Sequence, residues 1–250
     1  MIHLLLINGW SANMRFWQDF IADLPESFSC QVIDLDQDKA LNEWLELIDQ
    51  SVSKNTVLMG WSLGGTLAIQ YAASTNKSFL ALVTLQTNPC FLVRRGNVVG
   101  LDSNEFDALN ALVSDEPNKR KALVRQFTHL LVVGSLAHKE DRRNLKLNYS
   151  ETALSDVEVL RSGLKFLADL DARQALTEVP QPCLHIYGRH DALVPVEVSA
   201  LVKKNNPHHQ VQVIDEMAHL PCCAYRTDVI SSLDRFLEDI CGVKSLRGLV

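Results

Sequence analysis

Three features of the sequence predict an α/β fold in which helices flank a mainly parallel sheet. Short apolar runs that end in turn residues recur at residues 2–7, 30–35, 56–60, 79–86, 182–187 and 210–214. Amphipathic segments separate most of these runs, as in strands joined by crossover helices. Apolar residues also follow one another without alternation, as at 4–7, which is expected of strands covered by helices on both faces.

The composition is that of a globular protein. The 250 residues are 47% apolar and 22% charged, with only 11 glycines and 8 prolines, which excludes a disordered, collagenous or disulfide-dense chain. This length suits one large or two small domains. The net charge of −6 disfavours a nucleic-acid-binding protein of the ordinary basic kind.

The first run predicts a strand rather than a targeting signal. Residues 2–7 are too few for the core of a signal peptide and meet a turn at Asn8-Gly9. No run approaches the roughly 18 apolar residues of a membrane helix. We therefore expect a soluble, cytoplasmic protein with reduced and mostly buried thiols, in which the adjacent pair is the one to inspect. The six cysteines are Cys30, Cys90, Cys183, Cys222, Cys223 and Cys241.

The third run leads into a Gly-x-Ser-x-Gly turn and an alanine-rich helix start, the pattern of a nucleophile elbow. A serine hydroxyl becomes an effective nucleophile when it is exposed, held rigidly and placed beside a base. Glycines at 60 and 64 remove Cβ atoms that would collide across the turn, and Gly65 lets the helix pack close to the sheet. The motif predicts Ser62 as a nucleophile.

Two backbone N–H groups are candidates for an oxyanion hole. The first is that of Leu63, at the start of the helix after Ser62. The second is that of Trp10, in the loop after the first strand, where Gly9 lets the backbone turn close to the nucleophile. The alternative for Trp10 is an aromatic plug. The two roles of Trp10 are compatible, because its N–H can be a donor while its ring forms a wall of an acyl pocket.

About 90 residues without a strand pattern lie between the fourth and fifth runs. We predict that 89–179 form an inserted helical cap and that 1–88 and 180–250 form the core. In the clearest cap helix, Ser155 and Glu158 match a capping box. Packing on the sheet would explain the apolar stripe of this helix without any function. The stripe is Val157, Leu160, Leu164, Leu167 and Leu170.

The segment 117–147 is strongly basic. It carries a net charge of +6, which leaves −12 on the rest of the chain. A solvated helical face and a docking surface for an acidic partner are both compatible with this segregation. The basic residues are Lys119, Arg120, Lys121, Arg125, Lys139, Arg142, Arg143 and Lys146, and the acidic ones are Glu140 and Asp141.

The last two runs lead into loops that carry an acid and a base. Asp191 follows the run at 182–187, and His219 follows the run at 210–214. In a parallel sheet the carboxyl ends of strands share one edge, so Ser62, Asp191 and His219 can converge. Their order along the chain is the one expected for a catalytic triad of an α/β-hydrolase.

Other residues compete for these roles. His190 is an alternative base, and Asp34, which with Asp36 follows the second predicted strand, is an alternative acid. His185 lies within a strand pattern and is expected in the core. His208 and His209 follow Pro207 in a polar turn and are expected to be solvated. None of these histidines has metal-ligand spacing with a third partner, so no metal site is predicted.

Across the chain, these residues resemble the α/β-hydrolase superfamily. More narrowly, they are similar to the pimeloyl-[acyl-carrier protein] methyl ester esterases of biotin synthesis. The similar stretches are Asn8-Gly-Trp-Ser, Gly60-Trp-Ser-Leu-Gly-Gly, Val157-Glu-Val-Leu-Arg-Ser-Gly-Leu and Tyr187-Gly-Arg-His-Asp-Ala-Leu-Val-Pro. One departure is Asn8, where that family and many relatives have histidine. An asparagine can still brace the loop with hydrogen bonds.

The resemblance implies an α/β-hydrolase fold with a helical cap and a serine carboxylesterase that needs no cofactor or metal. Its substrate would be pimeloyl-acyl-carrier protein methyl ester, cleaved to the free carboxylate and methanol. The implied residues are Ser62, Asp191 and His219 for catalysis, Trp10 and Leu63 for the oxyanion and substrate, and Phe127 for the acyl channel.

The expected partner is the acidic acyl-carrier protein, bound by a monomer that contacts neither nucleic acid nor membrane. The docking candidates are Arg120, Lys121, Arg125, Arg142 and Arg143. Two alternatives remain open: a general short-chain carboxylesterase or lactonase, and a catalytically silent binding protein of the same fold. The presence of all three triad residues argues against the second.

Overall fold

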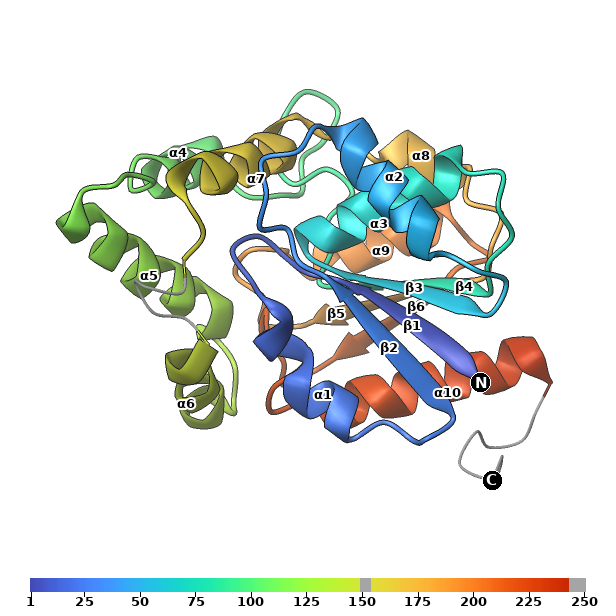
Figure 1. The fold of residues 1–250 in the computed structure, drawn as a ribbon. Helices are drawn as coiled ribbons and strands as arrows, with labels where there is room; N and C mark the ends of the chain where they lie inside the picture. Colours follow the sequence, from blue (N-terminus) through green and yellow to red (C-terminus); the bar gives the residue numbers. More distant parts are fainter. Residues whose placement is uncertain (149–153, 243–250) are drawn as a thin grey trace.

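The computed structural model describes residues 1–148 and 154–242 (Figure 1). Within them, six strands form one sheet in the order β2-β1-β3-β4-β5-β6, and every neighbouring pair is parallel. The predicted mainly parallel sheet is thus confirmed. The strands are β1 (Ile2–Ile7), β2 (Phe28–Ile33), β3 (Thr56–Trp61), β4 (Ala81–Leu85), β5 (Cys183–Gly188) and β6 (Gln210–Ile214).

Helices cover both faces of the sheet. Figure 1 shows α2, α3 and α9 on one face and α1 and α10 on the other. A short 3-10 helix, η1, precedes α1. Their bounds are η1 (Met14–Trp17), α1 (Gln18–Ala22), α2 (Leu41–Ser51), α3 (Leu63–Ser74), α9 (Glu197–Asn205) and α10 (Arg226–Cys241). No helix of the described part is long and apolar enough to cross a membrane.

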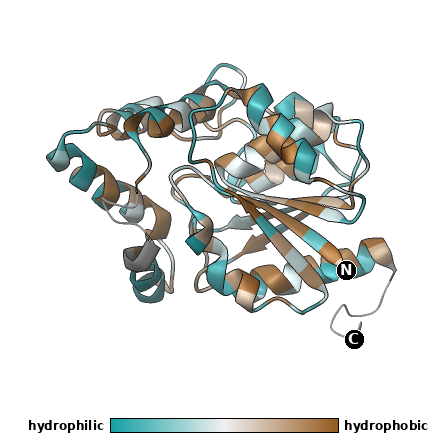
Figure 2. Ribbon diagram, viewed as in Figure 1, coloured by the Kyte–Doolittle hydropathy of each residue, from teal (hydrophilic) through white to brown (hydrophobic). Residues whose placement is uncertain are grey.

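Burial differs between the centre and the edges of the sheet. Every residue of β3, β4 and β5 is buried, whereas the edge strands β2 and β6 are mostly half-buried. Figure 2 accordingly shows hydrophobic colour along the strands and on the inner sides of the helices that cover them. Central strands have a neighbour on each side and helices on both faces, which accounts for their continuous apolar runs.

An inserted helical region lies between β4 and β5. It contains α4 (Ser103–Asn110), α5 (Pro117–Val132), α6 (His138–Asn148), α7 (Val157–Asp169) and α8 (Arg173–Thr177). Its two ends are side by side, because Cys90 bridges Asp171 and the N–H of Ala172 donates to the oxygen of Pro89 at 2.7 Å. The helices α4 to α7 extend beyond the edge at which the strands finish (Figure 1), whereas α8 packs against α3.

The start of α7 differs from the prediction. Asp156 is the N-cap, and its side chain makes no capping hydrogen bond. The predicted capping box is therefore wrong: Glu158 instead forms an ion pair with Arg161 at 2.8 Å. That pair links exposed side chains three residues apart on the helix surface, and the helix is stabilised mainly by its buried face.

The apolar stripe of α7 is buried, as expected, except that Leu170 at its end is only half-buried. Packing on the sheet does not explain it, however. The helix packs against α3, and its Leu164 and Leu167 line a pocket that also contains Ser62. Helical periodicity predicts that one face is buried, but it does not identify the surface that covers that face.

Candidate active site

Ser62 occupies a strained turn between β3 and α3. Its backbone angles are φ 52° and ψ −118°, in a region that residues other than glycine rarely adopt. The turn is held from both sides: the N–H of Ser62 donates to the oxygen of Leu85 at 2.9 Å, and the hydroxyl of Thr87 donates to the oxygen of Ser62 at 3.2 Å. The geometry is that of the elbow the motif predicts.

The glycines around Ser62 are required by close packing. A Cβ at Gly60 would overlap the backbone of Gly64, across the turn. A Cβ at Gly64 would overlap the carbonyl groups at the end of β1, and one at Gly65 would overlap the side chain of Thr87. The start of α3 can therefore approach the sheet only because three Cβ atoms are absent.

Asp191 and His219 form a buried pair. His219 Nδ1 lies 2.7 Å from Asp191 Oδ2, with both side chains almost fully buried. The other carboxylate oxygen accepts the N–H groups of Leu193 at 2.8 Å and Val194 at 2.9 Å. A carboxylate that faces Nδ1 favours the tautomer with the proton on that nitrogen, which leaves the lone pair of Nε2 for another partner.

The backbone around His219 is fixed by groups that the sequence did not single out. Trp61 Nε1 donates to the oxygen of His219 at 3.0 Å, and the N–H of His219 donates to the oxygen of Leu131 in α5 at 3.2 Å. Gln86, at positive φ, donates to the oxygen of Ala218 at 3.4 Å. Of these residues, only Trp61 could have been suspected from the sequence, because it directly precedes Ser62 in the motif.

Ser62 and His219 line one pocket, and the other lining residues within the described part of the chain are all apolar. Phe127 reaches this pocket from α5 and meets the ring of Trp10 edge to face, at 4.8 Å between centroids. Such a pocket suits a ligand with an apolar chain and one polar reacting group. The other lining residues are Trp10, Trp61, Phe91, Phe106, Leu109, Phe127, Leu164, Leu167 and Leu193.

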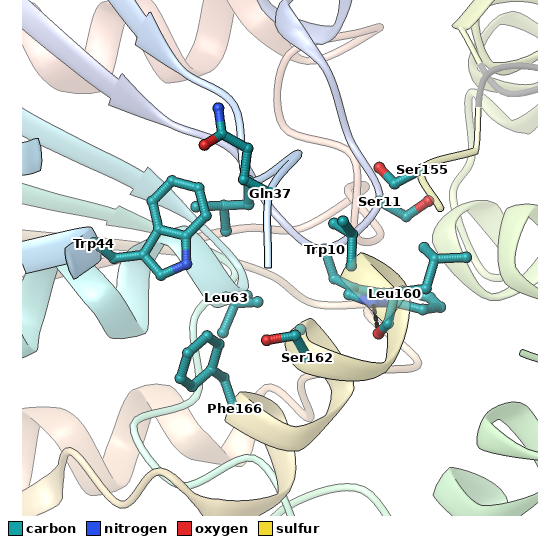
Figure 3. A pocket seen from close by; sticks show the side chains of 12 residues that line it. Trp10, Ser11, Gln37, Trp44, Leu63, Ser155, Leu160, Ser162 and Phe166 are labelled. Atoms are coloured by element: carbon teal, nitrogen blue, oxygen red, sulfur yellow. Dashed lines mark hydrogen bonds between the residues drawn. The ribbon is translucent and has the colours of Figure 1, made fainter. Parts of the chain in front are cut away.

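Trp10 separates this pocket from a second one. The second pocket lies between the loop before α2 and helix α7, and Figure 3 shows Trp10, Leu63 and Ser162 around it. The indole Nε1 of Trp10 donates to the oxygen of Leu160 at 2.9 Å, which fixes the ring against α7. The ring of Trp10 therefore lines both pockets, as expected of a ring that walls the acyl pocket.

The backbones of Trp10 and Leu63 follow adjacent strands. Ile7 of β1 pairs with Gly60 of β3. Trp10 comes three residues after Ile7, and Leu63 comes three residues after Gly60. Both therefore leave the sheet at the edge that carries Ser62. The first N–H groups of a helix have no acceptor within the helix, so that of Leu63 is open to an anion.

Asn8 braces the loop that carries Trp10. Its amide nitrogen donates to Asp34 Oδ1, and its oxygen accepts the indole N–H of Trp17 at 2.7 Å. Asn8 is fully buried and therefore ties β1 to the end of β2 and to η1. Asp34, whose pKa is raised by burial, is thus engaged by Asn8, whereas the carboxylate beside His219 is that of Asp191.

The remaining histidines take different positions. His190 is exposed, and its backbone N–H donates to the oxygen of Met217 at 3.0 Å. His185 is buried in β5, as expected. The expectation of a solvated His209 is wrong: it is only 8% exposed, because its ring packs against that of His185. A position in a polar turn did not reveal this partner 24 residues away.

The cysteines are free thiols. Four are buried, Cys30 is half-buried and Cys241 is exposed. The adjacent Cys222 and Cys223 are not joined to each other, and burial raises the pKa of Cys223 to about 12 and that of Cys222 well above its usual value. Both therefore remain protonated, unreactive thiols at neutral pH.

The basic segment presents most of its charge to solvent. Lys121, Arg125, Arg142 and Arg143 are exposed on α5 and α6. Asp141 is buried, and its carboxylate accepts a hydrogen bond from the hydroxyl of Ser135, so this acid is not presented at the surface.

Arg120 differs from the other docking candidates. It is half-buried and donates to the oxygens of Leu154 and Ser155 at 3.3 and 3.4 Å. Arg120 therefore links α5 to the segment before α7. The side chain of Lys146 lies outside the described part of the chain.

Comparisons with known proteins agree with this fold. A family model for the alpha/beta hydrolase fold matches residues 2–223. The pimeloyl-[acyl-carrier protein] methyl ester esterase of Salmonella newport (strain SL254) is 32% identical over 227 residues, covering 88% of this chain and 87% of that protein. The protein of the same name from Salmonella typhi is equally similar, with the same coverage.

Solved structures show the same architecture. An esterase from Exiguobacterium antarcticum has a TM-score of 0.78 at 20% identity, over 95% of this chain and 92% of its own. A bromoperoxidase from Bacillus anthracis has a TM-score of 0.79 at 21% identity, with the same coverage. At these identities the likeness concerns the fold alone.

Proposed function

This chain belongs to the alpha/beta hydrolase fold family, and from that premise we propose that it is a serine carboxylesterase. The nucleophile is Ser62, the base is His219, and Asp191 orients the base. The observation that carries this proposal is that Ser62 and His219 line the same pocket. His219 is hydrogen-bonded to Asp191 at 2.7 Å, and Ser62 has a φ of 52°.

The reaction proceeds in two acyl-transfer steps. His219 Nε2 takes the proton of Ser62, whose oxygen attacks the ester carbonyl carbon. The resulting oxyanion accepts hydrogen bonds from the N–H groups of Leu63 and Trp10, each worth about 3–4 kcal/mol in related sites. Collapse of this intermediate breaks the ester bond, and the leaving alcohol takes the proton from His219. Water, deprotonated by His219, then releases the free acid and restores Ser62.

The substrate we propose is the methyl ester of pimeloyl-acyl-carrier protein, with pimeloyl carboxylate and methanol as products of the hydrolysis. The 32% identity to esterases named for this substrate supports the assignment. The apolar pocket suits the methylene chain, and Phe127 contributes to it from the inserted region. We propose that residues 89–179 act as the cap of one functional domain, through which the acyl chain reaches Ser62.

A general short-chain carboxylesterase or lactonase is the second candidate. Three phenylalanines, Phe91, Phe106 and Phe127, contribute bulky rings to the pocket, and such a pocket also suits a short acyl chain. The two candidates share the same chemistry and differ only in the substrate. A silent binding protein would need neither the strained Ser62 nor the buried pair of Asp191 and His219.

Replacement of Ser62 tests the enzyme class. Ser62→Ala should abolish hydrolysis of a chromogenic short-chain ester, because it removes the nucleophile. The fold should survive, since the variant loses only one hydroxyl. Activity would be measured with purified protein and folding by thermal unfolding. More than a trace of activity in a folded variant would contradict the assignment of Ser62.

The carrier-bound methyl ester tests the substrate. We expect faster second-order turnover of this ester than of a free short-chain methyl ester. We also expect the gene to restore growth of a biotin-requiring strain that lacks its own esterase, and the Ser62→Ala variant to fail. Equal turnover of both esters without rescue of growth would favour the general carboxylesterase.

A further inference from the structure

Three potential metal ligands meet at the beginning of β5 and β6. One ligand atom from each of Cys183, His185 and His209 can be chosen so that all three lie within 4.8 Å of one another, and all three residues are buried. Cys183 and His185 are two residues apart on β5 and so face the same side of the sheet. His209 immediately precedes β6, whose first residue pairs with Leu184.

We propose that Cys183, His185 and His209 form a binding site for one Zn²⁺ ion. A thiolate with two imidazoles is a ligand set that zinc prefers. His185 Nε2 lies 3.1 Å from His209 Nδ1. Two nitrogens on a tetrahedral zinc, with bonds of about 2.0–2.1 Å, lie roughly 3.3 Å apart. The imidazoles therefore need only small shifts to hold the ion, and water can take the fourth position.

A neighbouring hydroxyl orients the central imidazole. Nδ1 of His185 lies 2.7 Å from the hydroxyl oxygen of Thr84, which can accept a hydrogen bond from an N–H at that nitrogen. Metal-binding histidines commonly donate their second ring nitrogen in this way. Burial, with a smaller effect of His209, lowers the pKa of His185 to about 3, so its ring is neutral at pH 7 and its Nε2 lone pair is available.

Metal binding must remove one proton from the cluster. Burial raises the pKa of Cys183 to about 12, so the metal-free protein carries a thiol, which donates to the oxygen of Gln181 at 3.2 Å. Formation of the zinc–sulfur bond breaks the sulfur–hydrogen bond and releases the proton to solvent. His209 needs only to move its ring proton from Nδ1 to Nε2. Uptake of Zn²⁺ should thus release one proton per ion.

Nearby positive charge opposes the ion. Lys203 Nζ donates to the oxygen of His209 at 2.8 Å, so its ammonium group lies close to the cluster. The charge of Lys203 and that of a protonated His208 both lower the pKa of His209, after the larger effect of burial. A bound cation would meet the same repulsion. The negative charge of the Cys183 thiolate is therefore essential to binding.

The position of the cluster indicates a structural role. It lies at the amino ends of β5 and β6, and the opposite ends of these strands lead to Asp191 and His219. An ion there would tie the two strands together at a distance from Ser62. The sequence did not indicate the site because a Cys-x-His pair and a histidine 24 residues later match no common metal-ligand spacing.

Cobalt and zinc titrations test the site on the whole chain after treatment with a chelator. We expect one equivalent of Co²⁺ to produce a thiolate-to-cobalt charge-transfer band, and Zn²⁺ to displace the cobalt and abolish that band. Zn²⁺ added to the metal-free protein should release one proton per ion. Zinc should also raise the Tm. In Cys183→Ser the band should vanish, and in His209→Asn the affinity should fall about 100-fold or more.

Matched controls separate the cluster from other thiols and histidines. Cys241→Ser removes an exposed thiol and His208→Asn the adjacent histidine, and both should bind metal as the unchanged protein does. Far-UV circular dichroism would check each fold. The proposal is overturned if the unchanged protein shows no charge-transfer band at micromolar Co²⁺, or if Cys241→Ser loses that band. It is equally overturned if folded His209→Asn binds with unchanged affinity.

Discussion

The two carboxylate oxygens of Asp191 have different partners. One accepts two backbone N–H groups of its own loop, and the other faces His219 Nδ1. The loop thus fixes the carboxylate, and the carboxylate fixes the ring. In the proposed mechanism, His219 makes the proton transfers, and this chain of hydrogen bonds gives Asp191 its orienting role.

Variants of these two residues should therefore differ in severity. His219→Ala should reduce kcat/KM on a chromogenic ester as much as Ser62→Ala does, since the residues act as a unit. Asp191→Asn should leave residual activity, because the ring remains but its tautomer is no longer enforced.

Two results would contradict this assignment. One is full activity in a folded Asp191→Asn variant, which would mean that the carboxylate does not need to orient the ring of His219. The other is normal activity in His219→Ala together with loss in His190→Ala. His190 is exposed and serves as the matched control, so His190→Ala should keep full activity.

At single residues, sequence reasoning succeeded where a residue type is dictated locally. The turn at Ser62 needs its glycines, and the residues that follow parallel strands must meet at one edge. The sequence did not predict contacts between side chains that are far apart along the chain and belong to no motif. The indole of Trp61 holds the oxygen of His219, and Asn8 joins Trp17 to Asp34, yet neither pairing follows from local sequence.

Among the elements, α7 determines where Trp10 lies. Gly163 is the residue of this helix that lets the ring approach, since a Cβ there would lie 2.5 Å from Trp10 Cδ1. The backbone oxygen of Leu160, one turn earlier, accepts the indole N–H. The contact therefore needs both a missing side chain and an available carbonyl group.

Gly163→Val should displace Trp10 and with it the loop that carries the candidate oxyanion donor. We expect kcat/KM on a short-chain ester to fall about 10- to 100-fold, the scale of a misplacement near 1 Å. Lys165→Ala, an exposed change on the same helix, is the control and should leave activity unchanged. Intrinsic fluorescence of the tryptophans would report the displacement. Full activity in folded Gly163→Val would show that the position of Trp10 does not matter.

The amino end of β5 should make the fold sensitive to acid. The folded protein holds the pKa of His185 at about 3, whereas an unfolded histidine titrates near 6.5. Between these values the unfolded chain binds a proton that the folded chain does not. The free energy of unfolding should therefore fall as pH decreases from about 6.5 towards 3, by up to about 1.4 kcal/mol per pH unit.

Urea unfolding at a series of pH values, in the presence of a chelator, measures this dependence. Below pH 6.5, the free energy of unfolding should depend less steeply on pH in His185→Gln than in the unchanged protein. Above pH 6.5, the two proteins should show the same slope. His209, whose pKa is also lowered by burial, contributes in the same direction. If the plots of unfolding free energy against pH were parallel for the two proteins over the whole range, His185 would not resist protonation in the folded protein.

The elements were more predictable than their ends and their surroundings. The succession of strands along the chain and the place of the insertion were predictable, because buried strands appear in the sequence as short apolar runs. The second strand nevertheless begins at Phe28 and ends at Ile33, because pairing with β1 sets its register whereas the apolar run extended to 35. The stripe of α7 was visible in the sequence, but its burial against α3 and Trp10 depends on how the insertion folds back.

At the scale of the molecule, charge is unevenly distributed. The segment 117–147 carries +6 in a chain of net charge −6. Burial of Asp141 leaves Glu140 as the exposed acid among the basic side chains of α5 and α6. Helix α5 also contributes Phe127 to the pocket of Ser62. On the proposed function, we expect this cationic surface to lie beside the route by which a carrier-bound acyl chain enters, and the negatively charged remainder of the chain to repel an acidic carrier.

Reversal of two of these charges tests whether the surface docks the carrier. The double variant Arg142→Glu, Arg143→Glu should lower kcat/KM for the carrier-bound methyl ester substantially, although each exposed pair contributes only about 0–1 kcal/mol. Turnover of a small free ester should not change, because it needs no docking. The loss should shrink as salt screens the attraction. The control Lys54→Glu, Lys204→Glu makes the same charge change at exposed sites outside the basic segment and should have little effect. Equal losses on both esters would indicate a damaged pocket, and no loss on either would exclude docking at this surface.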